Sequence, residues 1–242
     1  MARERKPRRG LLWALIGGAI LLAGLIAIFV NAALNQTAEV PPTSPPTSAA
    51  TETTPPTSEG DVVDPAAADS GWVPEPVTDD PELYIRRALE AASTFDTQLG
   101  ERDEWLTYLD TWFTPDTRYS SPADQLDEMD AAQLELRQSV VLPEPEWDSL
   151  AQEEGRVTAS VVGDLGYVDV PEDPSGDMHI GTANVTLTFV RTSGDGSEHS
   201  YDETVRVSVQ VLCGAGSVPT PDSPQQPGDC KIVRYFPEPM EP

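Results

Sequence analysis

The sequence predicts an α+β fold in which helices come first in the chain and then pack on a curved antiparallel sheet, like a cone. Over residues 81–134 apolar side chains recur at helical spacing, whereas from Gly155 onward they alternate with polar ones in a period of two. Such alternation is typical of antiparallel strands with one face on a core and one face in water. The composition before residue 80 is different again and predicts a membrane attachment.

An uncharged, proline-free stretch at residues 11–30 follows a basic tail at 1–10. As a helix it would rise ~30 Å, the thickness of a bilayer's hydrocarbon core. We therefore expect a single-pass transmembrane helix within 11–34, with the N-terminus in the cytoplasm by the positive-inside rule and the C-terminal part outside it. The alternative is a cleaved signal peptide ending near Val30-Asn31-Ala32, but signal peptides have apolar cores of only ~7–15 residues.

Within this stretch, Ala19, Ala23 and Ala27 repeat at four-residue spacing. Small residues on one helix face permit close helix packing in lipid, so a homo-oligomer held together by the anchor is a further expectation. Residues 35–79 are rich in Pro, Thr and acidic side chains and contain few apolar ones. This composition predicts a disordered, partly extended linker. The extracytoplasmic α+β domain is then expected at 80–242.

The charge of the chain restricts its partners. The formal net charge is −26, and because residues 1–10 hold five basic residues and one Glu, the remainder carries −30. So acidic a region is not expected to bind nucleic acid, which requires clustered Lys and Arg. It is also not expected to adhere electrostatically to an anionic membrane surface. Basic protein partners suit it better.

Three helices are expected in the first half of the domain. The first begins at Pro81 after an aspartate cap and runs to Leu99, where Gly100 ends it. The second spans 105–113 and carries an aromatic stripe that we interpret as core. A third, shorter and acidic helix is predicted over 122–134. The prolines at 143 and 145 are expected to break the chain before Trp147.

Four strands follow, with alternating apolar residues over 156–162, 183–189, 205–211 and 230–236. The sequence Thr192-Ser193-Gly194-Asp195-Gly196 predicts a turn between the second and the third of them. Strands joined in order by turns form a meander, whose apolar face the helices can cover.

The chain has two cysteines, Cys213 and Cys230, and both lie in the part expected outside the cytoplasm, where disulfides persist. The residues between them have a loop-like composition, and a bridge would close this loop with a stabilisation of ~3 kcal/mol. Two unrelated buried thiols are the alternative. No second cysteine pair or nearby histidine completes a zinc site.

The order of helices, then a curved sheet, resembles nuclear transport factor two-like domains. The plan of basic tail, membrane span, polar linker and domain resembles inner-membrane assembly subunits of type IV secretion and conjugation machines, in their actinobacterial form. The local resemblance is carried by Ala91–Thr97, Arg102–Leu106 and Trp112–Asp116. It implies a non-enzymatic scaffold that assembles with protein partners in a membrane complex. Relatives with two such domains in tandem differ from this chain.

No catalytic, cofactor-binding or metal-binding residue is predicted. His179 and His199 both lie beside predicted turns, and no nucleophile elbow, zinc helix or phosphate-binding glycine loop occurs. The carboxylates at 124, 127, 128 and 130 follow helical spacing and are interpreted as a solvated helix face, not a calcium site.

Two alternatives to a scaffold stay open. An isomerase- or dehydratase-like enzyme on the same fold requires a deep cone lined by a buried Asp or His with a shifted pKa. A tethered module for a lipid or cell-wall ligand requires a continuous apolar groove open to solvent.

Overall fold

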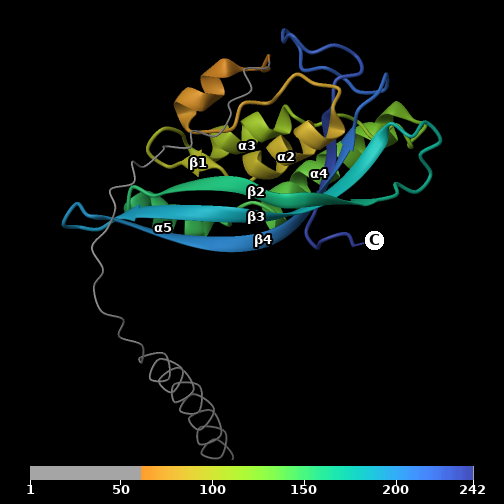
Figure 1. The fold of residues 1–242 in the computed structure, drawn as a ribbon. Helices are drawn as coiled ribbons and strands as arrows, with labels where there is room; N and C mark the ends of the chain where they lie inside the picture. The colour runs from red at the N-terminus through yellow and green to blue at the C-terminus, as the bar shows by residue number, and fades with distance from the viewer. Residues whose placement is uncertain (1–60, 242) are drawn as a thin grey trace, which may run out of the picture. The chain divides into compact units, whose positions relative to one another are not determined.

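A five-stranded antiparallel sheet forms the base of the fold in the computed structural model, which describes residues 61–241. Its strands pair in chain order, and α2, α3 and α4 lie on one side of it (Figure 1). The predicted α+β class and the meander are confirmed. The strands are β1 (Phe95–Asp96), β2 (Arg156–Val168), β3 (Met178–Thr192), β4 (Glu198–Leu212) and β5 (Lys231–Phe236).

Strands β2, β3 and β4 are longer than the apolar alternation predicts. The pairing of β2 with β3 continues past an irregularity between Val162 and Gly166, where Gly163 has a φ of 74°. The first half of β4 is exposed on both faces. With neither face buried, it does not need alternating apolar residues, and the sequence pattern therefore predicts only the second half of the strand. The hairpin between β3 and β4 turns at residues 193–197, as the sequence predicts.

The first two helices end earlier than expected. They are α2 (Pro81–Ala91) and α3 (Arg102–Asp110). After α2 the chain turns into β1, because the Thr94 hydroxyl accepts a hydrogen bond from the Ala159 N–H of β2. Phe95 therefore reaches the core from a strand, and Leu99 is 56% exposed instead of extending a helical stripe. The prediction of a helix to Leu99 was wrong.

The next two helices are α4 (Pro122–Ser139) and α5 (Glu144–Gln152). The first is longer than predicted, and its buried apolar residues are Ala132 and Leu136 rather than the exposed Leu126 and Leu134. The second was not predicted. Prolines 143 and 145 do not stop it, because they occupy the N-cap and the first turn, where a missing N–H costs nothing.

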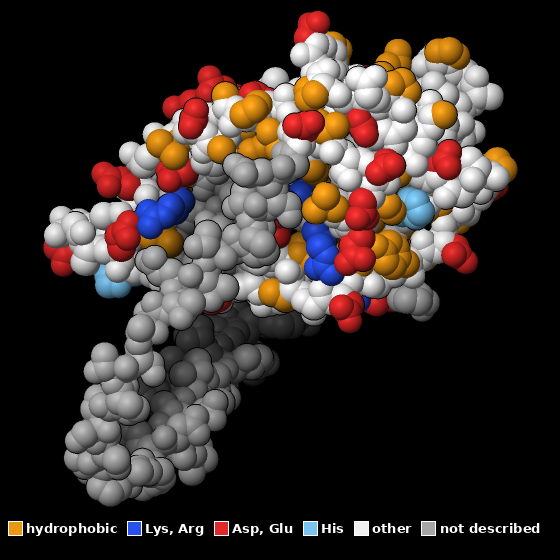
Figure 2. Space-filling view, turned by 45° about the horizontal axis from the view of Figure 1, so that its top comes forward, with side chains coloured by type: hydrophobic (Ala, Val, Ile, Leu, Met, Phe, Trp, Pro, Cys, Tyr) orange, Lys and Arg blue, Asp and Glu red, His pale blue; other side chains and the backbone are white. Residues whose placement is uncertain are grey.

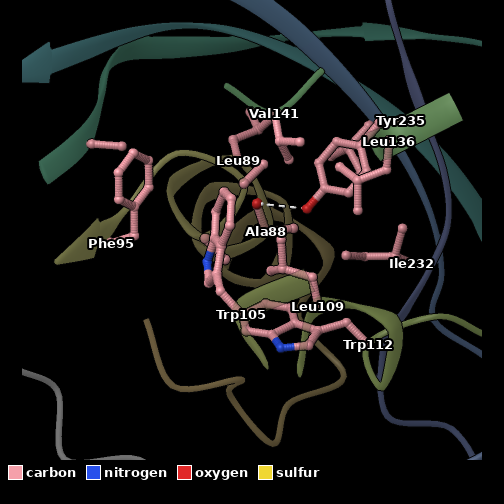
Figure 3. Packing of buried hydrophobic residues seen from close by; sticks show 14 of the residues in the cluster. Ala88, Leu89, Phe95, Trp105, Leu109, Trp112, Leu136, Val141, Ile232 and Tyr235 are labelled. Carbon is pink, nitrogen blue, oxygen red and sulfur yellow. Dashed lines mark hydrogen bonds between the residues drawn. The ribbon is translucent and has the colours of Figure 1, made fainter. Parts of the chain in front are cut away.

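The core lies between the helices and the inner face of the sheet, and Figure 3 shows its aromatic centre. Trp105 of α3 packs on Phe95 and Trp147, with ring centroids 5.1 and 5.6 Å away. The Tyr235 hydroxyl donates a hydrogen bond to the Ala88 carbonyl at 2.7 Å. The predicted core role of the aromatic stripe is confirmed.

Two close contacts position α2 on the sheet. Gly181 of β3 lies against Ile85, and a Cβ at this glycine would approach two carbon atoms of Ile85 to 2.9 Å. Side chains of α2 also bond to the free edge of β2: Glu90 Oε1 accepts from the Val161 N–H at 3.3 Å, and Arg86 donates to the Gly163 carbonyl at 3.0 Å. Together with Thr94, they occupy polar backbone groups that a neighbouring strand would otherwise pair with.

The folded part extends toward the N-terminus into the range predicted as linker. Residues 61–79 include a 3-10 helix, η1 (Pro65–Ser70), and the fully buried Glu75, and the Thr78 carbonyl accepts a hydrogen bond from the Cys230 N–H. The predicted tail at 1–10, the transmembrane helix within 11–34 and most of the linker lie outside the described residues. Within residues 61–241, no helix combines the length and apolarity needed to cross a membrane.

Candidate binding groove

A groove of about 480 Å³ opens on the inner face of the sheet, beyond the C-terminal end of α2. Its floor consists of Leu187 and Phe189 of β3 with Val205 and Val207 of β4. Its walls come from the end of α2 and from residues 140–143, which connect α4 to α5. We call this feature the groove.

Local structure explains why the groove is open. Helix α2 is fixed near the start of β3 by its contact at Gly181, and it ends before the strand reaches Leu187. Alternation along β4 places residues 203, 205 and 207 on the inner face. Val205 and Val207 stay half-buried as a result, although their side chains point to the same face as the core.

An aromatic and cationic cluster extends from one end of the groove. Tyr201 stacks on Phe189 with ring centroids 5.0 Å apart and planes within 4°. The Arg191 guanidinium lies 6.0 Å from the Tyr201 ring centroid and pairs with Glu153 at 3.0 Å. Tyr201 is 42% exposed. Tyr and Arg are enriched among the residues that contribute most to protein–protein binding.

Two charged residues line the groove, and only one has an ionic partner. Arg206 donates to both carboxylate oxygens of Glu241, at 2.6 and 3.2 Å. Glu203 is exposed, lies on β4 between Tyr201 and Val205 on the inner face, and belongs to none of the ion pairs in the described part of the chain.

The domain's own cations are almost all engaged. Residues 1–60 hold four of the chain's 41 acidic and five of its 15 basic residues, which leaves 37 against ten in residues 61–241. Nine of these ten form ion pairs, each with a different carboxylate, and the tenth, Arg102, donates to the Leu142 carbonyl. The acidic side chains scattered over the surface (Figure 2) therefore lack cations of the domain to neutralise them.

A second polar cluster, which we call the sealed centre, consists of Glu75, Lys231, Tyr84, Gln225 and Thr220. Glu75 Oε1 accepts hydrogen bonds from the Tyr84 hydroxyl, the Lys231 ammonium and the Gln225 amide at 2.6, 2.9 and 3.1 Å. The ammonium also donates to the Thr111 carbonyl and the Thr220 hydroxyl. Glu75 and Lys231 are 0% and 1% exposed.

Burial has the largest influence on the pKa values of Glu75 and Lys231. It raises the pKa of the Glu75 carboxyl, against the lowering influence of Lys231, and it lowers the pKa of the Lys231 ammonium. The enzyme alternative requires a deep cone lined by a buried Asp or His with a shifted pKa. Glu75 is a buried acid with a raised pKa, but it is neither of these residues and it does not line the groove; its Oε1 accepts three hydrogen bonds from side chains, and its Oε2 is buried without a partner.

The two histidines lie far apart in the sheet. His179 is opposite Val211 near the start of β3, whereas His199 is opposite Arg191 near the β3–β4 turn, where its Nε2 lies 3.2 Å from the Ser197 hydroxyl. Across residues 61–241 there is no group of three His, Cys, Asp or Glu side chains arranged to hold a metal ion. The carboxylates at 124, 127, 128 and 130 all lie on α4.

The structure contains the disulfide between Cys213 and Cys230. It joins the end of β4 to the start of β5 and closes the loop 214–229, which supplies Thr220 and Gln225 to the sealed centre. No sequence pattern predicts the sealed centre, because Glu75 lies between two prolines in a stretch with the composition of a linker. The sequence carries only a weak indication of the groove. Tyr201 and Glu203 lie at alternate positions before Val205, so they fall on the same face of β4 as the valines, but all residues around them are polar.

No protein-family model matches the chain, and no curated protein is significantly similar to it. Solved structures similar to it include a periplasmic fragment of TraM, at 13% identity and a TM-score of 0.37, over 62% of this chain and 89% of that one. CagV, a VirB8 homologue of the type IV secretion system of Helicobacter pylori, has 12% identity and a TM-score of 0.29, over 55% and 78%. An IcmL-like type IV secretion system protein from Legionella pneumophila has 10% identity and a TM-score of 0.35, over 65% and 88%. Similarity at this level does not assign a function.

Proposed function

We propose that the chain is a non-enzymatic, membrane-anchored assembly protein whose domain binds protein partners outside the cytoplasm, within a conjugative transfer apparatus of the type IV secretion kind. The observation that carries the proposal is the groove, which is open and apolar and ends in a Phe–Tyr stack beside an arginine. Apolar clefts with exposed aromatic and Arg side chains are typical of protein–protein binding sites.

The sequence supports the remaining parts of the proposal. The basic tail, the uncharged stretch and the Pro/Thr-rich segment support a single-pass anchor with a cytoplasmic N-terminus. The resemblance at Ala91–Thr97, Arg102–Leu106 and Trp112–Asp116 supports the conjugative context. The two-cysteine bridge supports an oxidising location.

Crosslinking in the native membranes tests this function. The full-length protein is crosslinked in place, purified and analysed by mass spectrometry for the proteins attached to it. A secretion ATPase or other channel subunits are the expected partners. Recovery of the protein alone, from cells in which the apparatus is assembled, would overturn the proposal.

A second function is favoured by the size of the groove. Pockets for small ligands typically measure ~300–1,000 Å³ and are mostly apolar, and the groove fits this description. A tethered module for a lipid or a cell-wall component would then carry a bound molecule after purification. Native mass spectrometry of the full-length protein, followed by solvent extraction, separates the two functions, because an assembly protein is expected to release no stoichiometric small molecule.

A further inference from the structure

The groove combines an apolar floor with a single unpaired carboxylate. Val205 and Val207 are half-buried, so an apolar side chain placed between them removes surface from water. Glu203 precedes Val205 by two residues on the same face of β4, and successive residues on one face are about 7 Å apart along a strand. In an extended segment, an apolar side chain and a charged one two residues away face the same side and have the same separation.

Among residues 61–241 no cation forms an ion pair with Glu203, since nine of the ten basic side chains pair with other carboxylates and Arg102 donates to the Leu142 carbonyl. Arg206, which lines the groove, pairs with Glu241, and Arg191, at the aromatic end, pairs with Glu153. The domain carries 27 more acidic than basic residues, since 37 oppose ten. An acidic partner would meet repulsion at this surface, whereas a basic one would be attracted to it.

We propose that the groove binds an extended segment of a partner protein in which an apolar side chain is followed two residues later by Lys or Arg, the apolar side chain lying between the valines and the cation pairing with Glu203. This inference rests on the proposed assembly function and specifies the chemistry of its partner.

The chain offers a matched pair of variants for the test. Glu203→Lys reverses the charge in the groove, and Asp202→Lys makes the same change at the next residue, which lies on the opposite face and accepts a hydrogen bond from Thr188. Both side chains are exposed and both variants change the net charge equally. A folding defect in either would appear as a shifted urea midpoint, so the comparison is made only on variants that unfold like the parent.

Binding is measured first with defined probes. Fluorescent peptides of equal length carrying Leu-Ala-Lys, Leu-Ala-Glu or Ser-Ala-Lys at their centre are titrated into the full-length protein, and polarisation is followed. We expect the Leu-Ala-Lys peptide to bind best, its binding to weaken at least ~10-fold with Glu203→Lys because like charges then meet, and to weaken much less with Asp202→Lys. Equal weakening by both variants, or equal binding of all three peptides, contradicts the proposal.

The natural segment is then identified in the membrane. A photo-crosslinking amino acid is placed at position 201, beside Glu203 on the inner face of β4, or, as the control, at 202, and the crosslinked peptides are sequenced by mass spectrometry. The expected result is a crosslink at 201 only, to a partner segment with Lys or Arg two residues from an apolar residue. A neutral or acidic segment, a second copy of this chain or a non-protein apolar molecule at 201 would each refute it.

The two proposals fail in different ways. If position 201 gives no crosslink while the purified complex still contains channel subunits, the groove is not the docking site and the assembly function stands. If no partner is recovered by either method, the assembly function itself fails.

Discussion

The sealed centre and the groove each have a glutamate close to a tyrosine, but the two regions differ in access to water. In the first, Glu75 faces Lys231 and two hydrogen-bond donors within the fold. In the second, Glu203 faces solvent beside Tyr201. A buried carboxylate must be satisfied by the protein itself, whereas an exposed one is hydrated and free to exchange water for a partner. The comparison teaches that burial and pairing, rather than residue type, distinguish a glutamate held inside the fold from one that stays accessible to a partner.

The largest expected effect comes from breaking the sealed centre. Lys231→Met should destabilise the protein by about 3–5 kcal/mol, because Glu75 would remain buried without its cation. The double variant Glu75→Gln with Lys231→Met should recover much of this loss. Urea unfolding of the full-length protein, followed by tryptophan fluorescence, measures both. A double variant as unstable as Lys231→Met would show that the pair itself, not the unpaired charge, determines stability.

An exposed ion pair provides the control. Arg156→Met removes the partner of Glu198, and both side chains are substantially exposed. Its urea midpoint should stay close to that of the parent, since exposed pairs contribute little.

Opening the disulfide is the next largest perturbation. Cys213→Ser with Cys230→Ser should cost about 3 kcal/mol in the chain-entropy description. Because the closed loop supplies Gln225 and Thr220 to the sealed centre, the loss should be smaller in the Glu75→Gln and Lys231→Met background. If the losses in stability simply add, the disulfide-closed loop and the sealed centre are not energetically coupled.

The pH dependence sharpens the comparison. The pKa of Glu75 is raised by burial, so the stability linked to its protonation is present below the unfolded pKa and is lost as pH rises through the folded pKa. Lys231→Met removes the cation that lowers this pKa, so the deficit of the variant should be smaller at mildly acidic pH than at neutral pH. Urea midpoints at the two pH values give the result. A deficit independent of pH would mean that Glu75 is already protonated in the folded parent.

The smallest effect on stability is expected in the groove. Glu203→Lys should leave the urea midpoint unchanged, because the side chain is exposed and has no ionic partner in residues 61–241. A large loss of stability would place Glu203 with Glu75 as a structural acid and remove the contrast between the two sites.

The fold class, the antiparallel meander and the disulfide could be predicted because each leaves a local signal: periodicity, turn residues and two cysteines. The end of α2 could not, because Ala91, Phe95 and Leu99 keep helical spacing while a tertiary hydrogen bond from β2 to Thr94 draws the chain into a strand. Helix α5 was missed because prolines at a helix start resemble breakers. The Glu75–Lys231 pair spans 156 residues and has no local pattern at all.

The side chains of α2 along the edge of β2 restrict how any partner can approach. Many proteins bind a partner by adding one of its strands to an open sheet edge. This mode depends on main-chain hydrogen bonds and therefore tolerates varied sequences. Here Thr94, Glu90 and Arg86 already occupy the N–H and C=O groups of Ala159, Val161 and Gly163. At these three positions a partner strand therefore has no free backbone group to pair with, and recognition there depends on side chains.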